Sequence, residues 1–300
     1  MRRISSFLAV AASLLVSAVA SLFAQEIPAD YQDVLKALAR SGDYKAGVFK
    51  VNVPRSDLQV TIAGRSTPTP FGFGGWVAMT KGDGGQEVLM GDLVLTQQEV
   101  NPVLSALLDN GIEVTALHNH FFWDEPRLFF MHLHGHGKAA DLARKLKPAL
   151  DQIGHGSHGP SAAPPAPASA LDTAALARIA GHAGEQLGPV YKITVGRDDL
   201  ALKEMGAAIN ARMGLNSWAA FAGSDADAQI AGDIAMREGE VQSVLKALRA
   251  HNLNIVAIHH HMLGTQTTVI FLHYWARGPA AKLAEGFRAA LDQLAEHGTH

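Results

Sequence analysis

The chain has 300 residues, a formal net charge of −3 at pH 7 and a pI near 6.6. This charge argues against a nucleic-acid-binding surface, which needs clustered Lys and Arg. The 48% hydrophobic content describes a globular protein and not a disordered one. Because the chain has no cysteine, disulfides and thiolate ligands are excluded, and any metal site must use His, Met, Asp or Glu.

The first 24 residues predict a secretory signal peptide. Met1-Arg2-Arg3 is positively charged, residues 7–20 are apolar, and Ala18-Val19-Ala20 has the small-x-small pattern of a cleavage site. A second possible cut lies at Ala24-Gln25. The alternative is a membrane anchor, since the apolar run can be extended to Ala24, about the minimum for a span. We expect a periplasmic or secreted protein with no membrane span after cleavage.

Beyond this leader, hydrophobic periodicity and turn residues predict a run of short strands and amphipathic helices. Thr96 is an expected helix cap, and Gly111 is expected to end the same helix. The first half should read helix, four strands, helix, two strands and helix, over residues 27–39, 47–53, 58–62, 76–79, 87–95, 96–110, 112–119, 127–134 and 138–150.

The same pattern then occurs a second time. Segments between Gly91 and His132 recur 141 residues later, between Gly232 and His273, and a constant offset indicates a duplicated structural unit. Each unit should be α+β, with a mainly antiparallel sheet and helices on one face, and the two units should be pseudo-twofold related. The expected organisation is a signal peptide, a first repeat, a Pro/Gly/Ala-rich linker and a second repeat, over residues 1–24, 25–153, 154–170 and 171–300.

Each repeat carries a His-x-His motif and a third His at the same spacing. In a strand, residues i and i+2 share a face, and a hairpin in the right register would bring the third imidazole beside them. A lone His on a strand is usually an ordinary hydrogen-bonded residue, but three in register in two diverged copies favour ligation. The sequence predicts one three-nitrogen metal site per repeat, formed by His118, His120 and His132 and by His259, His261 and His273.

Other polar and aromatic residues near these motifs also recur. Trp76 and Trp218 are expected to be buried in the core, with stacking on a ligand as the alternative. His260 should point away from the predicted site, because it lies between two ligands on a strand. The possible additional metal ligands are His134, Asp92 and Asp233.

Glu99 and Glu240 are candidate catalytic residues, either as partners of a His or as general bases. The simpler interpretation of Glu99 is a capping box with Thr96. Capping explains Glu240 less well, because Arg237 stands where the first repeat has Thr96.

Residues 111–120 and 126–132 resemble the LppY/LpqO family of exported bacterial proteins, as do residues 257–261 and 270–275 of the second copy. The resemblance covers nearly the whole mature chain and implies a secreted or cell-envelope protein of unknown activity. The namesakes of that family are lipoproteins. This chain lacks the lipobox cysteine, which implies a soluble periplasmic protein.

These features favour an exported metal-binding protein, with zinc or copper(II) as the metal because no thiol is available. A metal-dependent, hydrolase-like enzyme is the second hypothesis, since three His ligands leave a coordination position open. A third is a module that binds an organic ligand without metal. The expected partners are a metal ion or a small molecule.

Overall fold

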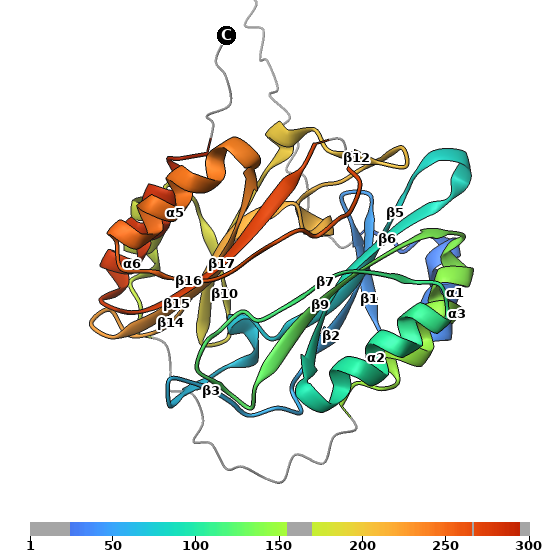
Figure 1. Ribbon diagram of the computed structural model, residues 1–300, viewed down its shortest axis with the longest axis horizontal. Coiled ribbons are helices and arrows are strands. Elements are labelled where there is room, and N and C mark those ends of the chain that lie inside the picture. Colours follow the sequence, from blue (N-terminus) through green and yellow to red (C-terminus); the bar gives the residue numbers. More distant parts are fainter. Residues whose placement is uncertain (1–24, 155–169, 266, 295–300) are drawn as a thin grey trace, which may run out of the picture.

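The structure is a computed structural model that describes residues 25–154, 170–265 and 267–294. It is α+β and consists of two similar, sheet-rich halves (Figure 1). The predicted signal peptide lies outside the described residues, as does the linker except for Gly154 and Ala170. Within the described part of the chain, no helix is both long and apolar enough to cross a membrane.

The first half has one six-stranded antiparallel sheet, ordered β1-β2-β5-β6-β9-β7. Its strands in that order are Gly42–Lys45, Val48–Pro54, Gly74–Lys81, Glu87–Thr96, Leu128–Gly137 and Glu113–His118. Helices α1, α2 and α3 are Ala29–Leu38, Gln97–Asp109 and Ala139–Leu150. A small sheet contains strands β3 (Val60–Ile62), β4 (Arg65–Thr67) and β8 (Asp124–Glu125). Two short 3-10 helices are η1 (Thr69–Phe71) and η2 (Asp83–Gly85).

The second half repeats this topology, with strand order β10-β11-β14-β15-β17-β16. Those strands are Gly184–Leu187, Val190–Gly196, Asn216–Gly223, Ala228–Arg237, Val269–Gly278 and Asn254–His259. Helices α4, α5 and α6 are Thr173–Ala180, Val241–Ala250 and Ala280–Leu291. A short hairpin contains strands β12 (Lys203–Glu204) and β13 (Ala207–Ala208). The 3-10 helices are η3 (Asp198–Leu200), η4 (Ala211–Met213) and η5 (Glu238–Glu240). The predicted α+β duplication is therefore confirmed.

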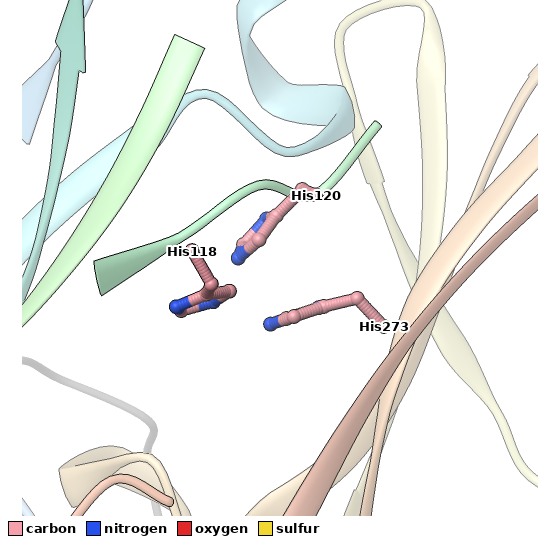
Figure 2. A group of neighbouring side chains, drawn as sticks. All are labelled: His118, His120 and His273. Carbon is pink, nitrogen blue, oxygen red and sulfur yellow. The ribbon is translucent and has the colours of Figure 1, made fainter. Parts of the chain in front are cut away.

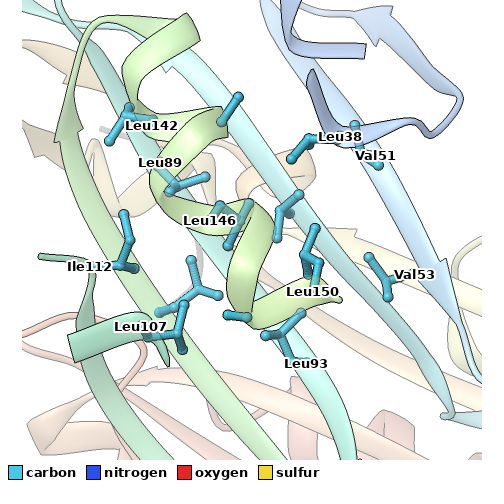
Figure 3. Close-up of a cluster of buried hydrophobic side chains, with 14 of the residues drawn as sticks. Leu38, Val51, Val53, Leu89, Leu93, Leu107, Ile112, Leu142, Leu146 and Leu150 are labelled. Carbon is cyan, nitrogen blue, oxygen red and sulfur yellow. The ribbon is translucent and has the colours of Figure 1, made fainter. Parts of the chain in front are cut away.

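The helices of each half cover the outer face of its sheet, so the two sheets lie between two helical layers (Figure 1). In the first half, Leu142, Leu146 and Leu150 recur every four residues along α3 and pack on the sheet (Figure 3). Leu89 and Leu93 meet them from β6. The alternating side chains of the same strands point to the opposite face, toward the other half.

Each half buries that inner face under a loop of the other half. Phe71 and Phe73, in the loop between β2 and β5, join one buried cluster with Ala220 and Ala231 of the second sheet. Met213 and Leu215, in the equivalent second loop, join another with Ala78 and Met90 of the first sheet. This exchange of loops fixes the two halves to each other through two apolar cores.

An Arg–Glu ion pair ties each of these loops to its own sheet. Arg55, with 1% of its side chain exposed, donates to Glu99 at 2.7 Å and to the Val94 carbonyl at 2.7 Å. Arg197 and Glu240 form the same pair in the second half, at 3.2 Å. Burial would raise the pKa of Glu99, but hydrogen bonds from the backbone of Thr96 and from Arg55 lower it below its usual range.

Replacing Arg55 by Met should destabilise the protein by about 3–5 kcal/mol, because Glu99 would remain buried without its cation. Urea unfolding would measure the loss. The matched control is Arg144→Ala, which removes an exposed pair with Asp141 and should cost less than about 0.5 kcal/mol. Because the pKa of Glu99 is lowered on folding, the contribution of the Arg55–Glu99 pair to stability is present at neutral pH. This contribution is lost on acidification below about 4.3, as Glu99 becomes protonated. Equal losses for both variants would contradict the role of the buried pair.

Candidate metal centre

The strand registers place the repeated polar residues in one row across each sheet. His132 on β9 lies opposite Asp92 on β6, and Asp92 lies opposite Trp76 on β5. In the second half, His273, Asp233 and Trp218 follow the same order. Opposed residues of antiparallel strands share a face. Each row therefore points to the inner face of its sheet, toward the other half.

The His-x-His motifs come from edge strands that end at this point. Strand β7 ends at His118 and β16 ends at His259, and the two strands lie close together. Thr115 on β7 donates to the carbonyl of His261 at 2.7 Å, which links the first repeat to the backbone of the second motif. The first motif is held by Asn119, which donates to the Leu128 carbonyl at 2.6 Å. His260, at the equivalent position, is exposed, as expected from the sequence.

The six predicted histidines gather in one cluster between the two halves. His118 and His259 stack at its centre, with ring centroids 3.7 Å apart. Each third His packs against the His-x-His of the other repeat: His120 lies 3.6 Å from His273, and His132 lies 4.0 Å from His261, both between ring centroids. Exchanging the two repeats converts one of these contacts into the other. The cluster thus has the internal symmetry expected of a pseudo-twofold pair.

The ligand atoms do not group as the predicted sites do, with three histidines from a single repeat in each. In the described part of the chain, two sets of three imidazoles have ligand atoms within 4.8 Å of one another. One set is His118, His120 and His273 (Figure 2). The other is His118, His132 and His259. Both sets draw on both repeats and both contain His118, so these histidine triads can hold a metal ion only with the two halves together.

Backbone carbonyls orient two of the imidazoles. Nδ1 of His273 lies 3.3 Å from the carbonyl oxygen of Gly232, and the backbone of Gly91 hydrogen-bonds His132. With Nδ1 bonded in this way, Nε2 is left to face the cluster, as in many metal-bound histidines. Gly232 must be glycine, because a Cβ there would lie 2.1 Å from the Trp218 carbonyl oxygen and 2.2 Å from the hydroxyl of Tyr274.

Five of the six histidines are buried, His118 is half-buried, and all six imidazoles are held neutral. Burial lowers the pKa of His118 to about 3 and lowers the pKa of the other five far below the usual value. Phe130 and Phe271 stack on His120 and His261 with centroids 3.3 and 3.4 Å apart and form apolar walls. Neutral imidazole is the form that binds metal, so the surroundings favour the ligating state.

The possible additional ligands divide into two groups. Asp233 is buried, with Oδ2 3.7 Å from Nε2 of His261 and 4.0 Å from Nε2 of His273. Asp92 occupies the equivalent position beside His132. His134 belongs to neither triad. Burial would lower its pKa, but the pairs with Glu204 at 2.9 Å and Glu113 at 3.6 Å raise that pKa above its usual value.

Glu99 and Glu240 do not lie at the cluster. Each is buried against an arginine and accepts a hydrogen bond at 2.8 Å from a backbone N–H, that of Thr96 or Arg237. The expectation that Arg237 weakens capping is wrong, because the N–H that reaches Glu240 belongs to the backbone and does not depend on the side chain. These contacts account for both carboxylates, and we propose no catalytic role for either.

A cleft of about 610 Å³ opens onto the cluster from between the two sheets. Its floor includes His120, His261 and His273 together with Asp92 and Asp233. Its walls include Trp76 and Trp218, which are half-buried. The expected burial of these indoles in the core is therefore only partly correct: one side of each packs on the protein and the rest lines the cleft.

Sequence reasoning missed two residues of this cleft, Lys50 and Lys192. Lys50 Nζ lies 4.1 Å from the centroid of the Trp76 ring, and Lys192 Nζ lies 4.3 Å from that of Trp218. The signal was present, since the two lysines are 142 residues apart, the offset that also relates the two tryptophans.

No curated protein matches the chain. Among solved structures, the crystal structure of EtuB from Clostridium kluyveri is 11% identical, with a TM-score of 0.20, over 83% of this chain and 88% of that one. A trimeric bacterial microcompartment shell protein, PduB, is 12% identical with a TM-score of 0.21 over the same shares. At these scores neither likeness carries an argument. The sequence profile of one family, however, matches both repeats, and the chain belongs to that family, described as Domain of Unknown Function (DUF1259), through residues 32–152 and 174–293.

Proposed function

We propose that the protein binds a divalent transition metal ion, zinc or copper(II), at the histidine cluster between its two repeats. The observation that supports this most directly is a set of buried ring nitrogens. In the described part of the chain, no hydrogen-bond partner exists for either nitrogen of His118, His120 and His259, or for Nε2 of His132, His261 and His273.

Burying these nitrogens without a hydrogen-bond partner or a ligand reduces the stability of the folded protein. A buried polar group without a partner costs about 1–3 kcal/mol, and buried polar groups are therefore nearly always satisfied. The summed cost of several such groups in one cluster would be a large fraction of the free energy of unfolding of a domain. A metal ion satisfies three of them at once through bonds of about 2 Å.

The donor set also indicates the kind of metal. Imidazole suits zinc and copper, whereas magnesium and calcium prefer oxygen ligands. One triad, His118, His120 and His273, adjoins Asp233, whose carboxylate could complete the coordination or orient an imidazole. Because both triads use His118, we propose a single ion shared by the repeats rather than one ion in each.

Export to the periplasm is part of the proposal. The charged and apolar pattern of residues 1–24 supports it, as does the resemblance to the LppY/LpqO family. The absence of cysteine from the sequence is also compatible with a compartment in which thiols oxidise. Detection of the mature protein in a periplasmic fraction, with its N-terminus near residue 21 or 25, would test this part.

A metal-dependent enzyme is the second candidate, and the cleft is the observation that favours it. A substrate in the cleft could reach the ion beside His120 and His273, where Asp233 provides a neighbouring carboxylate. The test is hydrolysis of p-nitrophenyl esters by zinc-loaded protein. Turnover that disappears in His118→Ala would support this candidate, and turnover equal in both proteins would exclude it for these esters.

His118→Ala should weaken zinc binding by at least about 100-fold, because the imidazole belongs to both triads and loss of one zinc ligand removes a directly bonded group. His260→Ala is the matched control, since this exposed neighbour of two cluster residues points away from it and should leave binding unchanged. Calorimetric titration with zinc at pH 7.5 measures both. Equal affinities for the two variants would refute the proposed site.

A second prediction separates a shared ion from one ion per repeat. If His120 and His273 bind the same ion, each single alanine variant should lose that ion, and the double variant should lose nothing further. If each repeat had its own ion, each single variant would retain one equivalent and only the double variant would lose both. Metal content per chain, measured after dialysis, distinguishes these results.

A further inference from the structure

The cleft above the histidine cluster has a positively charged wall that metal binding does not explain. Lys50 on β2 and Lys192 on β11 are half-buried and line it from opposite repeats. Each ammonium lies over the face of an indole, Trp76 or Trp218, an arrangement that fixes the charge toward the cleft.

Neither lysine has a carboxylate partner within 4.0 Å among the residues that the structure describes. Asp92 and Asp233 lie deeper, beside the imidazoles, and the Arg212 guanidinium at the rim is paired with Asp43. Burial and the neighbouring charge of Lys192 lower the pKa of Lys50 to about 7, and burial lowers that of Lys192. Glu185 on β10 lies opposite Lys192 and Asp43 on β1 lies opposite Lys50, and their attraction partly offsets the burial, but neither carboxylate reaches its lysine. A bound anion would supply the direct contact that these two half-buried ammonium groups lack.

The two indoles provide flat apolar surfaces within the cleft. Trp76 reaches across to Gly214 of the second repeat, where a Cβ would lie 3.2 Å from the indole, and Trp218 similarly reaches toward Gly72. The cleft volume of about 610 Å³ is within the range of small-molecule sites. The space therefore combines two cationic points with aromatic surfaces.

We propose that this cleft binds a small organic dianion, with one anionic group on Lys50, the other on Lys192, and its hydrocarbon part against the two indoles. This anion site extends the proposed function, and it rests on that function only in placing a metal ion at the floor of the same cleft. Lysine supplies a compact charge that attracts carboxylates without demanding the bidentate geometry of arginine. The aromatic faces favour a carbon skeleton over inorganic phosphate.

The test uses linear dicarboxylates from malonate to pimelate, each compared with the monocarboxylate of the same carbon number. Calorimetry at low salt, on zinc-loaded and on chelator-treated protein, measures affinity. We expect at least one dicarboxylate to bind about tenfold more tightly than its monocarboxylate, as a second charged contact provides. Its affinity should fall as ionic strength rises.

The variants Lys50→Gln and Lys192→Gln should each remove that preference, whereas Lys203→Gln, at an exposed lysine outside the cleft, should retain it. The urea-unfolding midpoint of the same variants confirms that they remain folded. Equal binding of di- and monocarboxylates, no binding of the series at millimolar concentration, or an unchanged preference in both cleft variants would overturn the inference. Dicarboxylate binding by a protein that binds no zinc would support it and refute the metal proposal instead.

Discussion

The packing of neutral imidazoles at the junction of two edge strands is the constraint on which the rest of the structure depends. Strands β7 and β16 are the free edges of their sheets, and both end at a His of the central stacked pair. An exposed sheet edge invites unwanted pairing with other chains. Here the two edges meet each other instead, and the Thr115–His261 hydrogen bond joins them. The cluster therefore exists only when both repeats are docked.

The exchanged loops provide the force that brings these edges together. Phe71 and Met213 are fully buried against the sheet of the other repeat, and burial of such side chains contributes about 1.5–3 kcal/mol each. The Arg55–Glu99 and Arg197–Glu240 pairs hold the bases of the same loops. Hydrophobic burial thus offsets the desolvation of the polar cluster, and the loops connect the stability of the fold to the geometry of the site.

Much of the fold could be predicted from the sequence, because its evidence is local. The strand expected over Glu87 to Leu95 is present as β6, where both faces are buried, and α2 begins beside Thr96 with Glu99 in its first turn. The constant offset between copies then carried each element of the first half onto the second. The short strands β1, β12 and β13 were missed, because four or fewer residues offer no period to detect.

The composition of the triads could not be predicted in the same way. An offset relates His132 to His273, but it contains no information on which repeat each of them contacts. That choice depends on how two sheets dock, which is decided by the loops around Phe71 and Met213 and not by the spacing of the ligands. The docking also decided the position of the indoles: Trp76 finds Gly214 of the other repeat, so part of the ring lines a cleft between the halves.

The exchange explains why duplication suits a site of this kind. A three-nitrogen site within one repeat would keep its ligands even if the repeats separated, whereas His118, His120 and His273 converge only across the interface. Binding of an ion there would stabilise the docked arrangement over the separated one, by an amount that grows with the ratio of the free ion concentration to its Kd. The two repeats differ at positions such as Asn119 and His260, where only one copy makes a contact, while the histidines of the cluster stand at equivalent positions in both.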